Sequence, residues 1–205
     1  MMRKAVCAVL MLLAIVLFWA APLCAENMMF GIKGGVSLAN LSGEDVYNNS
    51  IKYGGTGGVF MRYTLSDIFA VQPEALFAMK GAEYEADGLK SQEKVNYIEV
   101  PLLVRATLPN ESKIKPSVFL GPAIGILLSH KITNGEEIDI KDATKNSDIG
   151  VVAGAGIEYV LEKGCVLVDA RYEMGLSSIM KKVGGEQREV KNSVISITVG
   201  YGMKF

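Results

Sequence analysis

The chain has 205 residues, a formal net charge of -1 and hydrophobic residues at 50% of its positions. This length allows one domain of ordinary size. The balanced charge and the lack of a basic cluster exclude the phosphate-binding surface that nucleic acids require, so no nucleic-acid partner is expected.

The N-terminus predicts a secretory signal peptide over 1–25, followed by a single domain over 26–205. Arg3 and Lys4 form a short basic stretch, and 5–21 is almost wholly apolar. The sequence P-L-C-A at 22–25 follows, and cleavage is expected after Ala25. A chain with this leader is expected to be exported from the cytoplasm.

Two alternatives stay open for this leader. The apolar run is slightly long and Leu23 is large for its place, which leaves room for an uncleaved anchor. A lipoprotein cut before Cys24 is less favoured, because Leu23 stands where that signal needs a small residue. Cleavage would remove Cys7 and Cys24, so Cys165 would remain as a lone structural thiol without an intramolecular disulfide.

Eight segments of the expected domain alternate between apolar and polar residues, and in the first of them Phe30 and Ile32 share the apolar face. A period of two is that of a β-strand, and these segments reach the roughly 9–11 residues that a tilted strand needs to cross a bilayer. Pro73, Pro101 and Pro122 lie inside segments and lack a backbone donor, so we expect each at a bulge or a strand end. The segments are 29–39, 53–64, 68–84, 94–108, 115–132, 148–161, 165–174 and 192–205.

The connections between these segments alternate in length. Short periplasmic turns and longer outer loops are typical of bacterial outer-membrane barrels. The sequence therefore predicts an all-β fold, an eight-stranded antiparallel up-and-down transmembrane β-barrel with both termini in the periplasm. The short connections are 65–67, 109–114 and 162–164, and the long polar ones are 40–52, 85–93, 133–147 and 175–189.

Charged residues recur on the face opposite the apolar one, most clearly where Asp169, Arg171 and Glu173 alternate with Val168, Ala170 and Tyr172. Facing lipid at mid-bilayer, an Arg or Lys would cost roughly 2–4 kcal/mol, whereas ions that face inward can pair. An eight-stranded barrel is just wide enough for side chains to fill, so we expect a salt-bridged plug rather than an open pore. The predicted lumen charge network is Lys33, Arg62, Glu74, Glu99, Arg105, Glu158, Asp169, Arg171 and Glu173; Gln72 and Lys80 share the inward positions of the third segment.

The closing segment places apolar residues on every odd position from Ile195 to Phe205. Tyr201, Met203 and Phe205 are interpreted as a C-terminal insertion signal that the barrel assembly machinery recognises. Tyr63, Tyr159, Tyr201 and Phe205 are expected to face the lipid headgroups as aromatic girdles.

Five ordered motifs resemble the PorT-like outer membrane protein β-barrel family, which is common in Bacteroidetes-type bacteria. The resemblance implies a small eight-stranded outer-membrane barrel, mostly of unassigned function, with some relatives that assist protein secretion. It supplies no catalytic motif, and it implies that Glu74 and Glu99 are lumen residues. The motifs, which span essentially all of the mature chain, are F-G-I-K-G-G at 30–35, G-G-V-F at 57–60, Q-P-E at 72–74, Y-I-E-V-P-L-L at 97–103 and G-Y-G-M-K-F at 200–205.

No residue pattern predicts catalysis, a metal or a cofactor. His130 is the single histidine, and its neighbour Ser129 must point to the opposite face of a strand, so the two cannot form a nucleophile–base pair. We expect His130 to be a polar residue at the headgroup level. The acidic cluster at 136–142 lacks the spacing of a calcium loop and is expected to be a solvated outer loop. The glycine pairs open no helix and bind no phosphate.

Three functional hypotheses follow. The first is an integral outer-membrane barrel with a structural, surface-interaction or assembly role, in contact with outer-membrane lipid and presenting its long loops to a ligand or protein. The second is a narrow porin-like channel for small solutes. The third is a soluble periplasmic barrel of lipocalin type, which should carry its apolar face inside.

Overall fold

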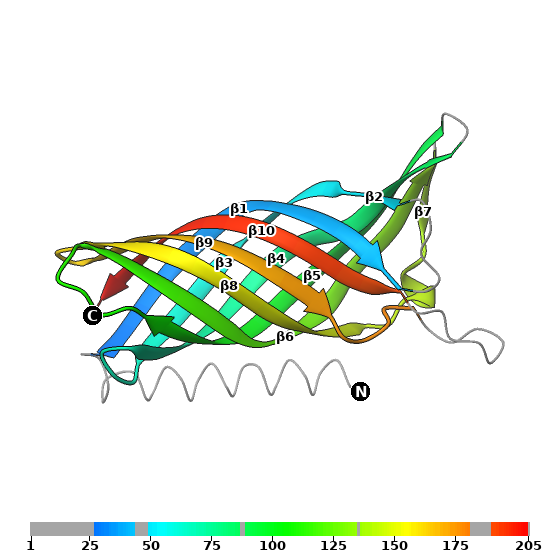
Figure 1. The fold of residues 1–205 in the computed structure, drawn as a ribbon. Helices are drawn as coiled ribbons and strands as arrows, with labels where there is room; N and C mark the ends of the chain where they lie inside the picture. Colours follow the sequence, from blue (N-terminus) through cyan, green and yellow to red (C-terminus); the bar gives the residue numbers. More distant parts are fainter. Residues whose placement is uncertain (1–26, 44–48, 87–88, 135, 181–189, 205) are drawn as a thin grey trace.

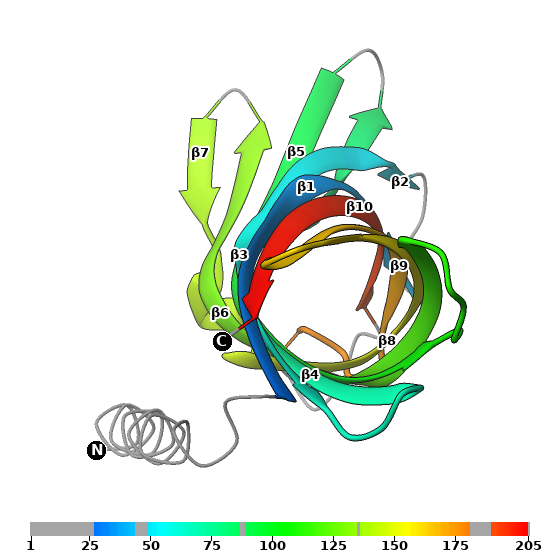
Figure 2. The same ribbon diagram turned by 90° about the vertical axis from the view of Figure 1, so that its left-hand side faces the viewer.

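The computed structural model describes residues 27–43, 49–86, 89–134, 136–180 and 190–204. Within these ranges eight long antiparallel strands form a closed barrel, each bonded to the next along the chain, and β1 bonds to β10 to close the ring (Figures 1 and 2). The predicted fold class is confirmed. The strands are β1 (Met28–Ser42), β3 (Lys52–Thr64), β4 (Phe69–Ala86), β5 (Leu89–Thr107), β6 (Ile114–Asn134), β8 (Ser147–Leu161), β9 (Gly164–Gly175) and β10 (Lys191–Lys204), with the short strands β2 (Asn49–Ser50) and β7 (Glu136–Asp139) beside them.

The barrel is apolar outside and polar inside. Along β9 the exposed residues include Val168 and Tyr172, whereas Asp169, Arg171 and Glu173 are buried within the lumen. The same alternation on the other strands leaves a belt of exposed isoleucine, valine, leucine and methionine side chains around the wall. This arrangement is the opposite of a soluble lipocalin-type barrel and rules that alternative out. None of the helices in the described ranges has the length and apolar character that would let it cross a membrane.

Glycines on the inner face make room for aromatic side chains in the lumen. The ring of Phe60 lies against Gly31 and Gly202, and the ring of Phe119 lies against Gly154, where an added Cβ would overlap the ring atoms. Small residues on one strand therefore accommodate large residues on its neighbour, as a barrel this narrow requires.

Pro73, Pro101 and Pro122, which we expected at bulges or strand ends, lie within paired strands instead. The one register shift between β5 and β6 falls at Asn96/Tyr97. Pairing between β5 and β6 lapses from Leu102 to Leu103 and resumes in the same register, and the opposite edge of β6 still pairs Pro122 with Val151. The missing proline donor thus interrupts the hydrogen bonds without displacing the strand.

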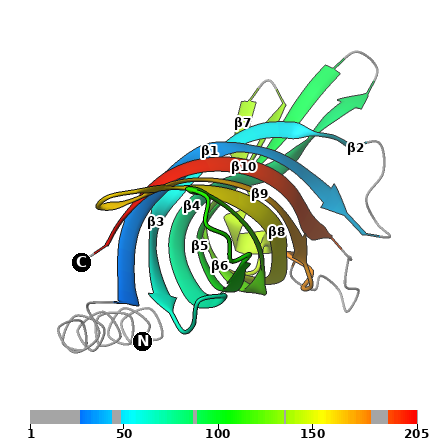
Figure 3. The same ribbon diagram turned by 60° about the vertical axis from the view of Figure 1, so that its left-hand side comes forward.

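The two ends of the barrel differ. At one end, here named the short-turn end, the connections are 65–68, 108–113 and 162–163, and β1 starts beside the end of β10. At the other, the extended end, the hairpins β4–β5 and β6–β7 rise beyond the wall, with β2 along the outer edge of β4 (Figures 1 and 3).

The prediction of a long loop at 85–93 was wrong. Residues 85–86 belong to β4 and 89–93 to β5, and the two strands stay paired as far as Ala86 and Leu89. The sequence of this segment shows no alternation of apolar and polar residues, so the apolar stripe that indicates a barrel strand is absent although the strands remain paired.

A small apolar core lies at the extended end of the barrel. It joins the end of β1, β4 and the segment between β9 and β10 through Leu41, Ala82, Ile179 and Val190, with Tyr84 packed against it. The backbone of this segment is fixed by hydrogen bonds from Ile179 N to the Val190 carbonyl and from Lys145 N to the Ile179 carbonyl. At the extended end, the described parts of this segment are therefore packed against the inner face of β1 and β4.

Candidate functional site: the charged lumen

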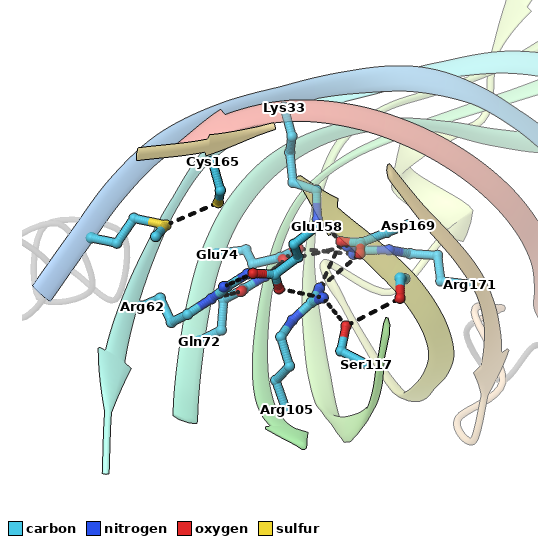
Figure 4. Close-up of polar contacts among 12 residues, drawn as sticks. Lys33, Arg62, Gln72, Glu74, Arg105, Ser117, Glu158, Cys165, Asp169 and Arg171 are labelled. Atoms are coloured by element: carbon cyan, nitrogen blue, oxygen red, sulfur yellow. Dashed lines mark hydrogen bonds and ion pairs between the residues drawn. The ribbon is translucent and has the colours of Figure 1, made fainter. Parts of the chain in front are cut away.

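All nine residues of the predicted charge network lie on the inner face, and each is between 0% and 7% exposed. They come from β1, β3, β4, β5, β8 and β9, so the closed wall brings together residues that are far apart in the sequence. Figure 4 shows seven of them meeting around the middle of the lumen.

A four-membered ring of ion pairs forms the centre of this network. Lys33 Nζ lies 3.0 Å from Glu74 Oε1 and 2.9 Å from Asp169 Oδ2. Arg171 closes the ring, with Nη1 at 2.8 Å from Glu74 Oε2 and Nη2 at 3.8 Å from Asp169 Oδ2. Each charge in the ring thus contacts two opposite charges, which is the condition under which buried ions are tolerated.

The chain of ion pairs continues from this ring toward the short-turn end. Arg105 Nη2 donates to both oxygens of Asp169 at 2.8 Å, and its Nη1 donates to Ser117 Oγ at 2.7 Å and to Glu158 Oε1 at 3.2 Å. Arg62 Nη1 reaches the other Glu158 oxygen at 2.7 Å. One unbroken series of contacts therefore runs from the ring to Arg62.

The other two predicted residues belong to a separate group nearer the extended end. Glu99 and Glu173 both pair with Lys80, and the Glu173 Oε1 to Lys80 Nζ distance is 2.6 Å. With every side chain counted at its formal charge, four cations and three carboxylates give the larger group +1, and the triad has -1. The ten charges cancel only when both groups are counted together.

Two phenylalanine rings complete the packing of the cations. Phe119 lies beneath Arg105 and Arg171, with guanidinium carbons 4.6 and 5.5 Å from the ring centre, and Phe60 lies 5.8 Å from Lys33 Nζ. Sequence reasoning did not select these rings. The sequence did contain the information needed to place them. Each phenylalanine stands between two non-aromatic apolar residues that face the lipid, so the alternation puts its ring in the lumen.

Two cavities lie on either side of the ring. The larger, about 340 Å³, is at the short-turn end, and the smaller, about 10 Å³, is beside Lys80 and Glu99. They share no lining residue. Lys33, Arg105 and Asp169 line neither cavity and fill the section between them.

His130 is fully buried rather than exposed at the headgroup level, so that prediction was wrong. Its Nε2 lies 2.6 Å from Glu93 Oε1 and its Nδ1 lies 2.7 Å from Thr144 Oγ1. Thr144 in turn donates to the Ile140 carbonyl, so its oxygen accepts from His130 Nδ1. These contacts tie β5 and β6 to the segment after β7. Ser129 faces away and accepts from Asn96, as its position next to His130 requires.

Within the described ranges, no three histidine, cysteine or acidic side chains gather as metal ligands. Asp139 and Glu137 are exposed on the β6–β7 hairpin, where Glu137 accepts from Lys131 at 2.5 Å. That hydrogen bond and the charge of Lys131 lower the pKa of Glu137, although both groups are solvated. The acidic cluster is thus a surface of solvated charges.

The residues of the predicted insertion signal lie on the outer face as far as they are described. Tyr201 and Met203 are 39% and 45% exposed near the short-turn end, and Phe205 falls outside the described residues. Of the expected girdle, Tyr159 is also exposed on the wall near that end, and Tyr63 is half-buried.

An apolar outer wall around a charged lumen, with short turns at one end and long hairpins at the other, defines an integral bacterial outer-membrane β-barrel protein. The chain belongs to the outer membrane protein beta-barrel domain family, whose model matches residues 24–181. None of the curated proteins matches the chain. The predicted outer-membrane location is confirmed. Because short turns are typical of the periplasmic side of such barrels, we expect the short-turn end to face the periplasm.

Solved structures of small outer-membrane barrels are similar to this fold. The outer membrane protein OprG from Pseudomonas aeruginosa is 13% identical, with a TM-score of 0.57 over 88% of this chain and 97% of that one. Neisserial surface protein A is 15% identical, with a TM-score of 0.53 over 86% and 97%. The E. coli outer membrane protein W is 16% identical, with a TM-score of 0.53 over 88% and 99%. At these identities the likeness extends to the fold alone.

Proposed function

We propose that this protein is a closed, non-catalytic barrel that presents its extended end at the cell surface, where it has a structural or surface-interaction role. The observation that carries the proposal is the buried network of ion pairs that fills the lumen between the two cavities. A barrel blocked in this way acts through its outer surface rather than through its axis.

The extended end supplies a surface suited to contact. Strands β2, β4, β5, β6 and β7 are bonded in that order and rise beyond the membrane wall as one sheet. The buried contacts of His130 with Glu93 and Thr144 hold this sheet in a fixed shape. A rigid, polar platform can bind a ligand or protein without the entropic cost of ordering a loop.

The PorT-like resemblance, which rests on the sequence motifs alone, supports an assembly or secretion role as a form of this surface function. It supports no turnover, since the motifs carry no catalytic group. His130 is engaged at both ring nitrogens, which leaves neither nitrogen available as a base toward a substrate.

A narrow channel for small solutes is the second candidate, and the cavity of about 340 Å³ at the periplasmic end is the observation that favours it. Passage would require the ring around Lys33 and Asp169 to open. Each of these groups contacts two or more opposite charges, so a conducting path would have to separate several pairs at once.

Conductance across planar lipid bilayers separates the two candidates. The purified protein is expected to show no stable current steps. The charge-neutral double variant Arg105→Ala/Asp169→Ala, which removes two facing side chains from the plug, is the positive control for an opened lumen. Stable steps in the unchanged protein that disappear when Arg171 is replaced would favour the channel instead.

The surface role is tested by shortening the β4–β5 hairpin, joining Glu83 to Gln92 through a two-residue turn. Cells that lack the protein are complemented with the full-length or the shortened barrel, at matched outer-membrane levels. A surface-interaction role predicts that only the full-length protein restores cell–cell or cell–surface adhesion. If both forms restore adhesion equally, the platform is not the interacting surface.

A further inference from the structure

The cavity at the periplasmic end has the size and lining of a small ligand site. Its volume of about 340 Å³ lies at the lower end of the range for small-molecule pockets. It is partly open, and its walls come from the periplasmic ends of the strands and from the turn at 65–68. It has no part in the proposed surface role, which concerns the opposite end of the barrel.

Arg62 lines this cavity and carries an unused donor. Its Nε donates to Gln72 at 2.8 Å and its Nη1 donates to Glu158 at 2.7 Å, but among the described residues the buried Nη2 has no hydrogen-bond partner. The side chain is 93% buried. A guanidinium N–H2 group left without an acceptor costs free energy, and an anionic ligand would satisfy it with a charge-assisted bond.

The other charges around the cavity also favour an anion. Lys115 and Lys204 lie at its rim with Arg62, whereas Glu158 has both oxygens occupied by Arg62 and Arg105. Asp67, in the exposed turn, is the remaining carboxylate of the described lining. The described lining therefore carries one more positive charge than negative.

Part of the remaining wall is apolar. Met29 and Cys165 lie in one buried cluster with Phe60 and Leu167, and the buried Ala70 extends the apolar lining on β4. We propose that this cavity binds a small amphipathic carboxylate from the periplasm, with its carboxylate on Arg62 Nη2 and its short alkyl tail against Met29 and Cys165.

The test follows the methyl group of Met29 by NMR, in protein labelled at its methionine methyl groups and placed in nanodiscs of zwitterionic lipid. Hexanoate is titrated as the probe, and hexan-1-ol, with the same tail and no charge, is the matched control ligand. Hexanoate is expected to shift the Met29 signal saturably, and hexan-1-ol to bind about tenfold or more weakly, since a hydrogen bond to a charged group contributes about 1.5–3 kcal/mol. Met174, exposed on the lipid-facing wall, reports simple partitioning into the bilayer.

The variant Arg62→Lys keeps the charge that pairs with Glu158 but removes the free Nη2 donor, and it is expected to weaken hexanoate binding about tenfold or more. Heat-modifiable gel mobility establishes whether the variant is folded; if it is not, Lys115→Gln at the rim takes its place, with a smaller loss expected. Equal shifts from both ligands, a Met29 response that merely follows Met174, or no saturable shift would each overturn the proposal.

A separate sample with anionic lipid and no hexanoate distinguishes a free carboxylate from a lipid headgroup. If the Met29 signal shifts in that sample and does not respond to hexanoate, the site binds a lipid headgroup and the proposal of a free carboxylate is refuted.

This test is independent of the conductance and adhesion experiments. A blocked lumen with an unresponsive Met29 would contradict the ligand site alone, whereas a conducting barrel that still binds hexanoate would contradict the closed barrel alone.

Discussion

Asp169 is the residue on which the lumen network depends most strongly. Its carboxylate accepts two bonds of 2.8 Å from Arg105, lies 2.9 Å from Lys33 Nζ, and is 3.8 Å from Arg171 Nη2. The isosteric change Asp169→Asn removes the charge without altering volume. It leaves three cations around a neutral amide and raises the net charge of the larger group from +1 to +2.

The expected loss of unfolding free energy is about 3–5 kcal/mol, the range for removing one partner of a buried ion pair. The matched control is Lys33→Met, which lowers the net charge of the group to zero. Glu74 then retains Arg171 at 2.8 Å, and Asp169 retains Arg105, so we expect a loss of at most about 2 kcal/mol.

Urea unfolding in lipid vesicles, followed by circular dichroism and by heat-modifiable gel mobility, measures both variants under the same conditions. We expect Asp169→Asn to lose more unfolding free energy than Lys33→Met, and this order tests whether charge balance controls the stability of the lumen network. If Lys33→Met destabilises the barrel as much as Asp169→Asn, or if Asp169→Asn costs less than about 1 kcal/mol, the charge balance described here does not control stability.

Three further outcomes are expected. Val168→Arg places a cation on the lipid-facing wall next to the inward Asp169 and should cost about 2–4 kcal/mol in the same unfolding assay; an unchanged midpoint would contradict the assigned wall orientation. Gly81 has φ of 118°, and a Cβ there would overlap the Glu93 carbonyl, so Gly81→Ala should destabilise the β4–β5 hairpin by at least about 1 kcal/mol, seen as faster amide exchange confined to that hairpin. Burial and the Glu93 carboxylate raise the pKa of Tyr84 above its usual 10.0, so the unfolded hairpin loses this proton first and hairpin stability should fall as the pH rises above 10.0. Amide exchange in Tyr84→Phe should lack that additional loss, and an identical pH profile in both proteins would exclude Tyr84 as its cause.

The period of two in the sequence was sufficient to place residues on the correct face of the wall. Lys33, Asp169 and Arg171 could be assigned to the lumen because their neighbours on either side are small, aliphatic or aromatic, and only the orientation with the charges inward is tolerated in a bilayer. The partners within the lumen could not be assigned. Arg105 and Asp169 are 64 residues apart, and their contact depends on strand tilt and stagger, which the alternation does not specify.

The pattern also failed where the wall leaves the membrane. From Met79 onward on β4, and before Asn96 on the paired β5, lipid no longer constrains the outer face. Polar residues such as Glu83 and Lys94 therefore occupy it while the ladder continues. His130 illustrates the result. Its polarity and its place at the end of a strand predicted a residue at the headgroup level, but His130 is buried and bonded to Glu93 and Thr144 in a site that the paired hairpins create.

The larger ion-pair group draws its seven charges from six different strands, with Lys33 on β1 and Asp169 on β9. A sheet that is only partly wound in the bilayer cannot supply all of these partners, and it would hold bare ions in hydrocarbon. Assembly intermediates with a wrong strand register or a missing strand are therefore destabilised at several strands at once. The ion-pair network in this way favours the closed barrel, in which β1 and β10 are paired.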